Sequence, residues 1–136
     1  GADLAKIDGV TAMTDVTGFG LLGHLLEICQ GSHLTAEVQL ANIPLLDHAV
    51  IDYFSQNCVP GGSARNWESI APSIAGTDLL SQALLCDPQT SGGLLVAVNS
   101  NSAQQVSDLL KACGCYHLPI GALYKPADGI TIQVSP

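Results

Sequence analysis

The residues best suited to chemistry lie in one stretch, residues 11–24, with the sequence TAMTDVTGFGLLGH. Asp15 stands just ahead of a predicted helix start, where its carboxylate could hold a cation between itself and a phosphate. Thr14 and Thr17 place hydroxyl groups on either side of it, and the amides at a helix N-terminus favour anions. This order of residue types suits a ligand that carries phosphate and a metal ion.

Three glycines, Gly18, Gly20 and Gly23, fall in the first two turns of that helix. Each costs roughly 1 kcal/mol relative to alanine, so each needs a reason. A closely packed neighbour would supply one, and so would an anion bound at exposed amides. The sequence leaves both explanations open.

Other candidate nucleophiles and metal ligands carry weaker signals. Ser91 lacks the G-x-S-x-G frame of a nucleophile elbow, and no base can be assigned to it. The five cysteines form an odd set without paired C-x-x-C motifs, and the closest two, in Cys113-Gly-Cys115, are too near each other for ordinary zinc geometry. His48 has no acid or cysteine at ligand spacing. We therefore expect free thiols in a reduced, cytoplasmic protein.

The charge balance excludes one large class of partners. The chain of 136 residues has a net charge of −8 and four cationic side chains, Lys6, Arg65, Lys111 and Lys125. Sequence-independent nucleic-acid binding needs several such groups on phosphates, so we expect no nucleic-acid partner. A bound nucleotide would need backbone amides, metal ions or another chain segment to offset its charge.

Length and hydropathy favour one globular domain with a single core. The chain is 47% hydrophobic, its longest apolar runs are too short to span a bilayer, and no cleavable signal is recognisable, so no membrane partner is expected. The abrupt start at Gly1-Ala2 suggests a domain taken from a longer protein.

Strands and helices are predicted to alternate along the chain. Strands are predicted at residues 10–13, 35–40, 94–98, 118–124 and 130–134. Helices are predicted from an N-cap at Thr17 to about Gln30, with Gly31 in the left-handed position, from Ile43-Pro44 onward, over 77–85 with Thr77 as the cap, and over 101–113 with Gly114 closing it. The pattern predicts an α/β or α+β fold with a mixed β-sheet flanked by helices.

Apolar residues at the period of each element are expected to face the core. In the helices they are Leu21, Leu25 and Ile28 with Leu22, Leu26 and Cys29 beside them, then Leu46, Val50 and Tyr53, and then Ala103, Val106, Leu110 and Cys113. In the strand at 35–40 they are Ala36, Val38 and Leu40.

Three of these segments carry more specific expectations. The continuous apolar run 94–98 predicts a strand covered on both faces. The turn-rich residues 125–129 predict a hairpin between the last two strands. Residues 58–76, which include Pro60-Gly61-Gly62 and Arg65-Asn66-Trp67, show no clear periodicity. They are either a surface connection or a loop that contacts a ligand or another domain.

Three motifs together resemble the selenophosphate synthetase (selenide, water dikinase) family. They are TDVTGFGLLGH at 14–24, PGGSARN at 60–66 and DPQTSGGLL at 87–95. The resemblance is to the C-terminal domain of this family and runs from about Gly9 to Tyr124. The wider superfamily includes aminoimidazole ribonucleotide synthetase, whose C-terminal domain has a mixed sheet flanked by helices, partly like a ferredoxin fold.

The resemblance implies an ATP-dependent enzyme that makes selenophosphate from selenide and releases AMP and orthophosphate, with Mg²⁺ on the nucleotide phosphates. Asp15 would be the carboxylate that this domain lends to the magnesium cluster, and Thr14, Thr17, Gly18 and Gly20 would contact the phosphates. The remaining acidic ligands, the catalytic Cys or selenocysteine and an essential Lys belong to an N-terminal half that is absent from residues 1–136.

Residues 1–136 are therefore expected to form a single domain with no catalytic residue, inactive alone and part of a homodimer in the full-length enzyme. The face with Thr14, Asp15 and Gly18 is expected to be open to solvent, because its natural cover is the absent half. The turn 87–93 either lies beside the same cleft or shapes the sheet edge. The alternative function is a non-catalytic module for small-molecule binding or dimerisation, since a shared fold does not give function.

Overall fold

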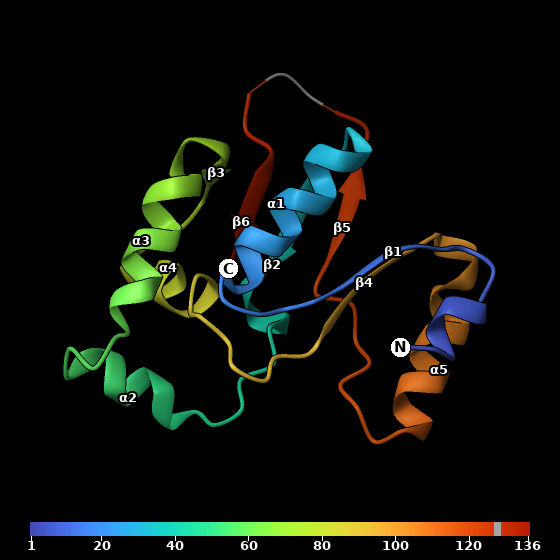
Figure 1. Cartoon of the computed structure of the whole chain (residues 1–136), viewed down its shortest axis with the longest axis horizontal. Helices are drawn as coiled ribbons and strands as arrows, with labels where there is room; N and C mark the ends of the chain where they lie inside the picture. Colours follow the sequence, from blue (N-terminus) through green and yellow to red (C-terminus); the bar gives the residue numbers. More distant parts are fainter. Residues whose placement is uncertain (127–128) are drawn as a thin grey trace.

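The computed structural model describes residues 1–126 and 129–136 and places the strands in two sheets (Figure 1). One is an antiparallel ribbon of β1 (Val10–Asp15) and β4 (Leu94–Val98). The other has the strand order β3-β6-β2-β5. Its strands are β2 (Thr35–Gln39), β3 (Ile74–Ala75), β5 (Gly121–Tyr124) and β6 (Ile132–Ser135). This sheet is mixed, because β2 runs parallel to β6 and antiparallel to β5.

Helices flank both sheets. They are α1 (Gly20–Ser32), α2 (Ala49–Ser55), α3 (Gly61–Ile70), α4 (Leu79–Leu85) and α5 (Ala103–Ala112). Short 3₁₀ helices occur at Leu4–Lys6, Leu40–Asn42, Ala71–Ser73 and Ser100–Ser102. In Figure 1, α1 lies across the four-stranded sheet, α3 and α4 lie on one side of it, and α5 lies at the far end of the ribbon. The predicted fold class, a mixed sheet flanked by helices, is confirmed.

The main core forms where α1 meets the four-stranded sheet. Of the predicted apolar stripe of α1, Leu22, Leu25, Leu26 and Cys29 are buried, and Leu21 and Ile28 are half-buried. The stripe packs in one cluster with the inward residues of β2 and β6, among them Val38 and Ile132. Burying a leucine side chain contributes about 1.5 to 3 kcal/mol, so this stripe is what holds α1 against the sheet.

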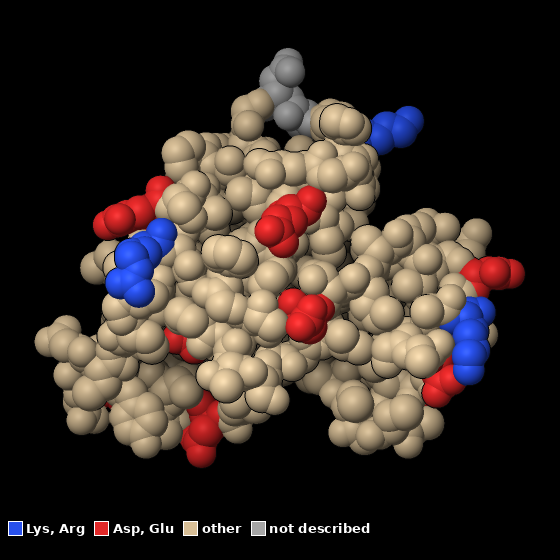
Figure 2. Space-filling model, viewed as in Figure 1, with Lys and Arg blue, Asp and Glu red and all other residues tan. Residues whose placement is uncertain are grey.

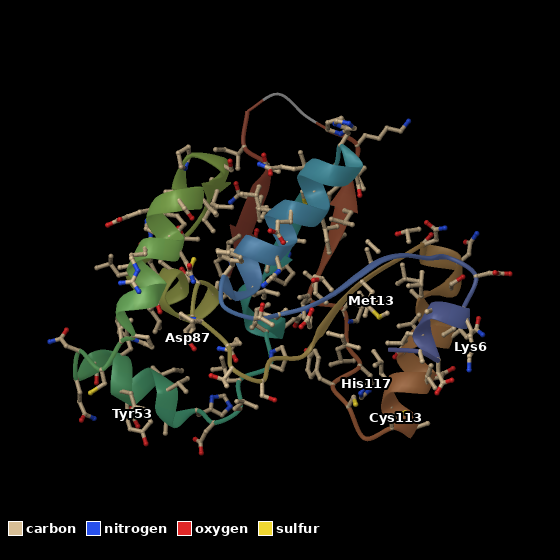
Figure 3. The ribbon with its side chains drawn as sticks, viewed as in Figure 1. Lys6, Met13, Tyr53, Asp87, Cys113 and His117 are labelled. Carbon is tan, nitrogen blue, oxygen red and sulfur yellow. The ribbon has the colours of Figure 1, made fainter. Side chains whose placement is uncertain are left out.

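A second, smaller cluster holds the other end of the ribbon. It consists of Leu4, Ile7 and Val106, with half-buried neighbours that include Val96 and Met13. Figure 3 shows Met13 between the ribbon and α5. The ribbon therefore runs between two apolar clusters. Coverage on both faces was predicted for 94–98; it holds over 95–98 and fails at Leu94, which is 47% exposed.

Helix α1 begins and ends later than predicted. Thr17 is not its N-cap, because its hydroxyl contacts His24 and the helix starts at Gly20. Gly31 lies inside the helix, and the left-handed residue after its end is His33, with φ of 53°. Tertiary contacts of the loop before α1 outweigh the local preference of threonine for the cap position.

The helix expected from Ile43-Pro44 forms later and on the surface. Helix α2 starts at Ala49, whose amide donates to Asp47 Oδ1 at 2.8 Å. None of its residues is buried, and Leu46, expected on its apolar face, is 96% exposed. The expected apolar stripe was therefore wrong for this segment.

Residues 58–76 contain a helix that the sequence pattern did not indicate. Helix α3 buries Ser63 and Ile70, and its half-buried Trp67 packs on the main core, so the apolar contacts come from its C-terminal half. Small and polar residues make the contacts of its N-terminal half, and hydrophobic periodicity does not detect a helix whose apolar face is this short.

The predicted hairpin at 125–129 is also wrong. Strands β5 and β6 do not pair with each other; both pair with β2, which lies between them. Two residues of the expected turn, 127 and 128, lie outside the described residues. Local turn signals identify a reversal of the chain, but the choice of partner strand depends on which surfaces the core buries.

The start of α4 was predicted wrongly, whereas the end of α5 was predicted correctly. The N-cap of α4 is Asp78 and not Thr77, because Asp78 forms a reciprocal capping box with Ser81. Gly114 follows α5 with φ of 69°, as predicted, whereas Cys113, expected to point inward, is exposed.

Candidate functional site

The three sequence motifs meet at the loop between β1 and α1, residues 16–19, here called the β1–α1 loop. The Val16 amide donates to Gly93 O at 2.9 Å, and the Gln89 amide donates to Thr17 O at 3.0 Å. The turn 87–93 therefore lies directly beside this loop. From the second motif, the side-chain amide of Asn66 donates to Gly18 O at 2.8 Å.

Asp15 is the last residue of β1 and lies opposite Leu94 in the ribbon. Its side chain is exposed, and among the described residues no side chain or amide forms a hydrogen bond or ion pair with its carboxylate. Lys6, one of the chain's few cations, pairs instead with Asp3 at 2.8 Å. The Asp15 carboxylate is thus free to meet a ligand from outside the domain.

The donor set fits one carboxylate of a magnesium site and no more. Within residues 1–126 and 129–136, no group of three or more His, Cys, Asp or Glu side chains converges to hold a metal. Mg²⁺ commonly takes one or two protein carboxylates and completes its shell with water and substrate phosphates. Figure 2 shows the Lys and Arg side chains of one face at its margins, with acidic groups nearer its middle. Phosphate charge is therefore not offset by protein cations on that face.

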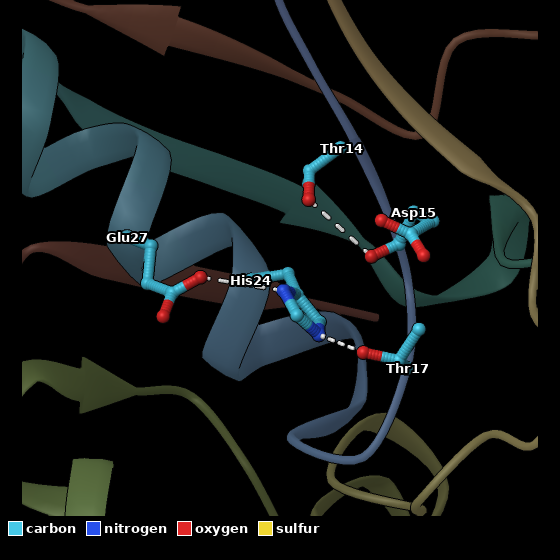
Figure 4. A network of polar contacts seen from close by, with 5 residues as sticks. All are labelled: Thr14, Asp15, Thr17, His24 and Glu27. Carbon is cyan, nitrogen blue, oxygen red and sulfur yellow. Dashed lines mark hydrogen bonds and ion pairs between the residues drawn. The ribbon is translucent and has the colours of Figure 1, made fainter.

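Thr14 does not share a face with Asp15. Successive side chains of a strand point to opposite sides, and Thr14 lies opposite the buried Leu95. Its hydroxyl donates a long bond, 3.3 Å, to the backbone oxygen of Asp15 (Figure 4). The two side chains therefore do not converge on one ligand.

Thr17 belongs to a chain of polar contacts that ends in a carboxylate (Figure 4). Its Oγ1 lies 3.1 Å from Nε2 of His24, and Nδ1 of His24 lies 3.3 Å from Oε2 of Glu27. His24 is 7% exposed, and its Nδ1 has no partner with hydrogen-bond geometry in the described structure. The imidazole also packs edge-on against the ring of Phe19, with centroids 5.9 Å apart. His24 thereby fixes the Thr17 side chain.

The structure gives two of the three glycines a packing role. Gly20 has φ of 72°, and a Cβ there would lie 2.6 Å from the backbone carbonyl carbon of Cys86; a Cβ at Gly23 would lie 2.7 Å from Cβ of Phe19. The Gly20 amide donates to Thr17 O, so it offers no free donor to a phosphate. Gly18 is exposed, and a Cβ there would meet nothing within 4 Å. Of the three glycines, Gly18 is therefore the one whose surroundings leave room for a ligand.

Asp87 holds the turn that flanks the loop. Figure 3 shows it at the junction of α3 and α4. Its carboxylate accepts bonds from Ser63 Oγ at 3.4 Å and from Gln89 Nε2 at 2.7 Å. Burial raises the pKa of the Asp87 carboxyl, and the two hydrogen bonds oppose that rise.

Sequence reasoning assigned no role to His24, Asn66 or Asp87, although all three lie inside the quoted motifs. Their signal was their position in those motifs rather than their type. Asn66 and Asp87 act through contacts with segments distant in sequence, whereas His24 contacts the loop before its own helix.

The chain is similar to known proteins over nearly its whole length. Residues 2–129 match a family described as "AIR synthase related protein, C-terminal domain". The selenide, water dikinase of Haemophilus influenzae (strain 86-028NP) is 50% identical over 135 residues, which cover 98% of this chain and 39% of that protein. That of Shewanella sp. (strain MR-4) is 52% identical over 128 residues, which cover 94% of this chain and 36% of that protein. The chain thus spans less than two fifths of the length of these relatives. None of the helices in its described part has the length and apolar character needed to cross a bilayer.

Proposed function

The chain belongs to the family of AIR synthase related proteins, whose C-terminal domain it matches, and we propose that it is the C-terminal domain of a selenophosphate synthetase. The observation that carries this proposal is identity of about one half, over nearly the whole chain, to proteins named selenide, water dikinase. The whole protein would use ATP and selenide to form selenophosphate, with release of AMP and orthophosphate.

In that enzyme this domain forms one wall of the Mg-ATP site. Asp15 would hold a magnesium ion, a role supported by its exposure and by the absence of any competing partner in the described structure. When bound, the ion would offset phosphate charge that a domain of net charge −8 does not. Thr17 and Gly18 are the better-placed of the predicted phosphate contacts, because the Gly20 amide is already bonded and Thr14 lies on the other face.

The other components of the site come from outside this chain. We propose that the remaining metal ligands, the redox-active nucleophile and the essential lysine belong to the part of the protein that the relatives have beyond the match. We also propose that the full-length enzyme is a cytoplasmic homodimer. Its cytoplasmic location is supported by the five free cysteines, which a reducing compartment maintains.

The test compares the full-length protein with this chain alone. AMP formation is measured with ATP and Mg²⁺, with and without selenide, and binding of Mg-ATP to the 136-residue chain is measured by calorimetry. We expect selenide-dependent AMP formation by the full-length protein, and neither micromolar binding nor AMP release by the isolated domain. Full-length protein that forms no AMP with selenide would contradict the proposed function. Micromolar binding by the isolated chain would contradict the shared site.

A further inference from the structure

One face of α3 is fitted to the segments around the β1–α1 loop. Gly62, Ser63 and Asn66 lie at spacings that put them on the same side of a helix. A Cβ at Gly62 would lie 2.5 Å from Cγ of Pro88, so the turn after α4 packs directly on the helix backbone there. One residue later, the Ser63 hydroxyl donates to Asp87. This face of α3 is therefore built to contact other segments rather than solvent.

Asn66 makes the connection that reaches the loop itself. Its Nδ2 donates to Gly18 O at 2.8 Å and to Cys86 O at 2.9 Å. A side-chain amide has two N–H donors, and both are used here at good hydrogen-bond distances. Gly18 belongs to the first motif, whereas Cys86 is the C-cap of α4 and directly precedes the third. One side chain of the second motif therefore joins the other two.

The position of Gly18 depends on this bridge. The backbone of the adjacent Thr17 is also held, since Thr17 O accepts bonds from the amides of Gln89 and Gly20. Gly20 also packs on the Cys86 backbone. The Asn66 amide ties Gly18 to that same Cys86. The loop is thus fastened at two consecutive residues.

We propose that Asn66 is a positioning residue that orients the β1–α1 loop, and with it Asp15 and Thr17, for the reaction. Asn66 touches no reacting group in this assignment; it acts through Gly18 and Cys86. The part of the inference that concerns turnover rests on the proposed function. The part that concerns the order of the loop does not.

The experiment replaces Asn66 with aspartate in the full-length protein. Asn66→Asp keeps the size of the side chain, removes the two donors and places a carboxylate oxygen against two carbonyl oxygens. Asn42→Asp is the matched control, because it makes the same charge change at an exposed asparagine whose amide donates to Pro119 O instead. Amide hydrogen exchange and steady-state kinetics are measured for both variants.

In Asn66→Asp, we expect the amides of Gly20 and Gln89 to exchange about tenfold faster, while the amides of Ala36 and Gln39 in β2 are unchanged. The kcat for selenide-dependent AMP formation should fall about tenfold or more, since small misplacements of a site are costly. The KM for ATP should change less, and Asn42→Asp should resemble the unaltered protein in every readout.

Three outcomes would overturn the inference. Unchanged exchange at Gly20 and Gln89 would show that Asn66 does not hold the loop. Equal acceleration in β2 would show a general loss of stability. A loosened loop with normal kcat would show that its orientation is irrelevant to the reaction. If the unaltered protein lacks selenide-dependent activity, the proposed function fails, and normal exchange at these amides in Asn66→Asp would then overturn the assignment of Asn66 by itself.

Discussion

The two sides of the junction between β1 and α1 are built differently. On the inner side, Gly20 packs on the Cys86 backbone, and hydrogen bonds from Gln89 and Asn66 hold the carbonyls of the loop. On the outer side, the Asp15 carboxylate is exposed, and its neighbour across the ribbon, Leu94, is 47% exposed. Packing and hydrogen bonds on the inner side fix the backbone of the loop, while the Asp15 side chain on the outer side remains free. The packed backbone and the exposed carboxylate thus lie within a few residues of each other.

The largest loss of activity should follow from replacing Asp15, on the outer side of the junction. In the full-length enzyme, Asp15→Asn keeps the size of the side chain but removes the charge that a Mg²⁺ ligand needs, so selenide-dependent AMP formation should fall by about 100-fold or more. Part of the loss should be recovered at high magnesium. The free energy of unfolding should stay nearly unchanged, because the carboxylate has no partner in the described structure.

Asp52→Asn, at an exposed position on α2, is the matched control and should leave turnover unchanged. If Asp15→Asn unfolds the protein, or leaves turnover intact, Asp15 is part of the scaffold and the comparison between the two sides fails.

The two glycines of the loop should respond in opposite ways. Gly20→Ala would put a Cβ into the Cys86 backbone at a φ that alanine rarely adopts, which should lower the free energy of unfolding by about 3 kcal/mol or more. Gly18→Ala enters open space, so its effect on stability should stay within about 0.5 kcal/mol. Urea denaturation of this chain measures both. In the full-length enzyme, Gly18→Ala should lower turnover without loss of stability if the open space faces the substrate. Equal stability of the two variants would contradict the packing role of Gly20.

The smallest expected effect is a change in the pH dependence of stability, and it concerns Asp78, the N-cap of α4. Its carboxylate accepts a bond from the Ser81 amide at 2.8 Å, and this bond, with that from the Ser81 hydroxyl, lowers the pKa of Asp78. The ionised cap therefore stabilises α4 above the ordinary carboxyl pKa, near 4, and that stabilisation is lost as the pH falls through the lowered pKa. Between pH 7 and pH 3, unfolding measurements should show a steeper loss of stability for the natural protein than for Asp78→Asn. Parallel curves would contradict the cap.

Hydrophobic periodicity identified the elements whose burial is apolar. The stripe on α1 and the alternation of Ala36 and Val38 on β2 were recognised because these residues meet the core at the period of their own element. Helix α3 was missed for the opposite reason, since Gly62, Ser63 and Asn66 make the contacts of its first two turns and its apolar contacts are confined to Trp67 and Ile70. The sequence singled out residues 14–24 as the candidate site, but it could not distinguish the roles of the glycines there. Their roles depend on Cys86 and Phe19, which approach them only in the folded chain.

The sequence by itself determined the fold class, the three motifs and Asp15 as an acidic residue just ahead of a helix. Composition, spacing and residue type are local properties, so they can be read from the chain without knowing its tertiary contacts. Only the tertiary structure decided that β2 separates β5 from β6, that Gly20 packs while Gly18 stays open, and that Asn66 joins Gly18 to Cys86. Each of these depends on contacts between segments far apart in the chain, because folding selects such contacts by the burial and hydrogen bonding of the whole domain.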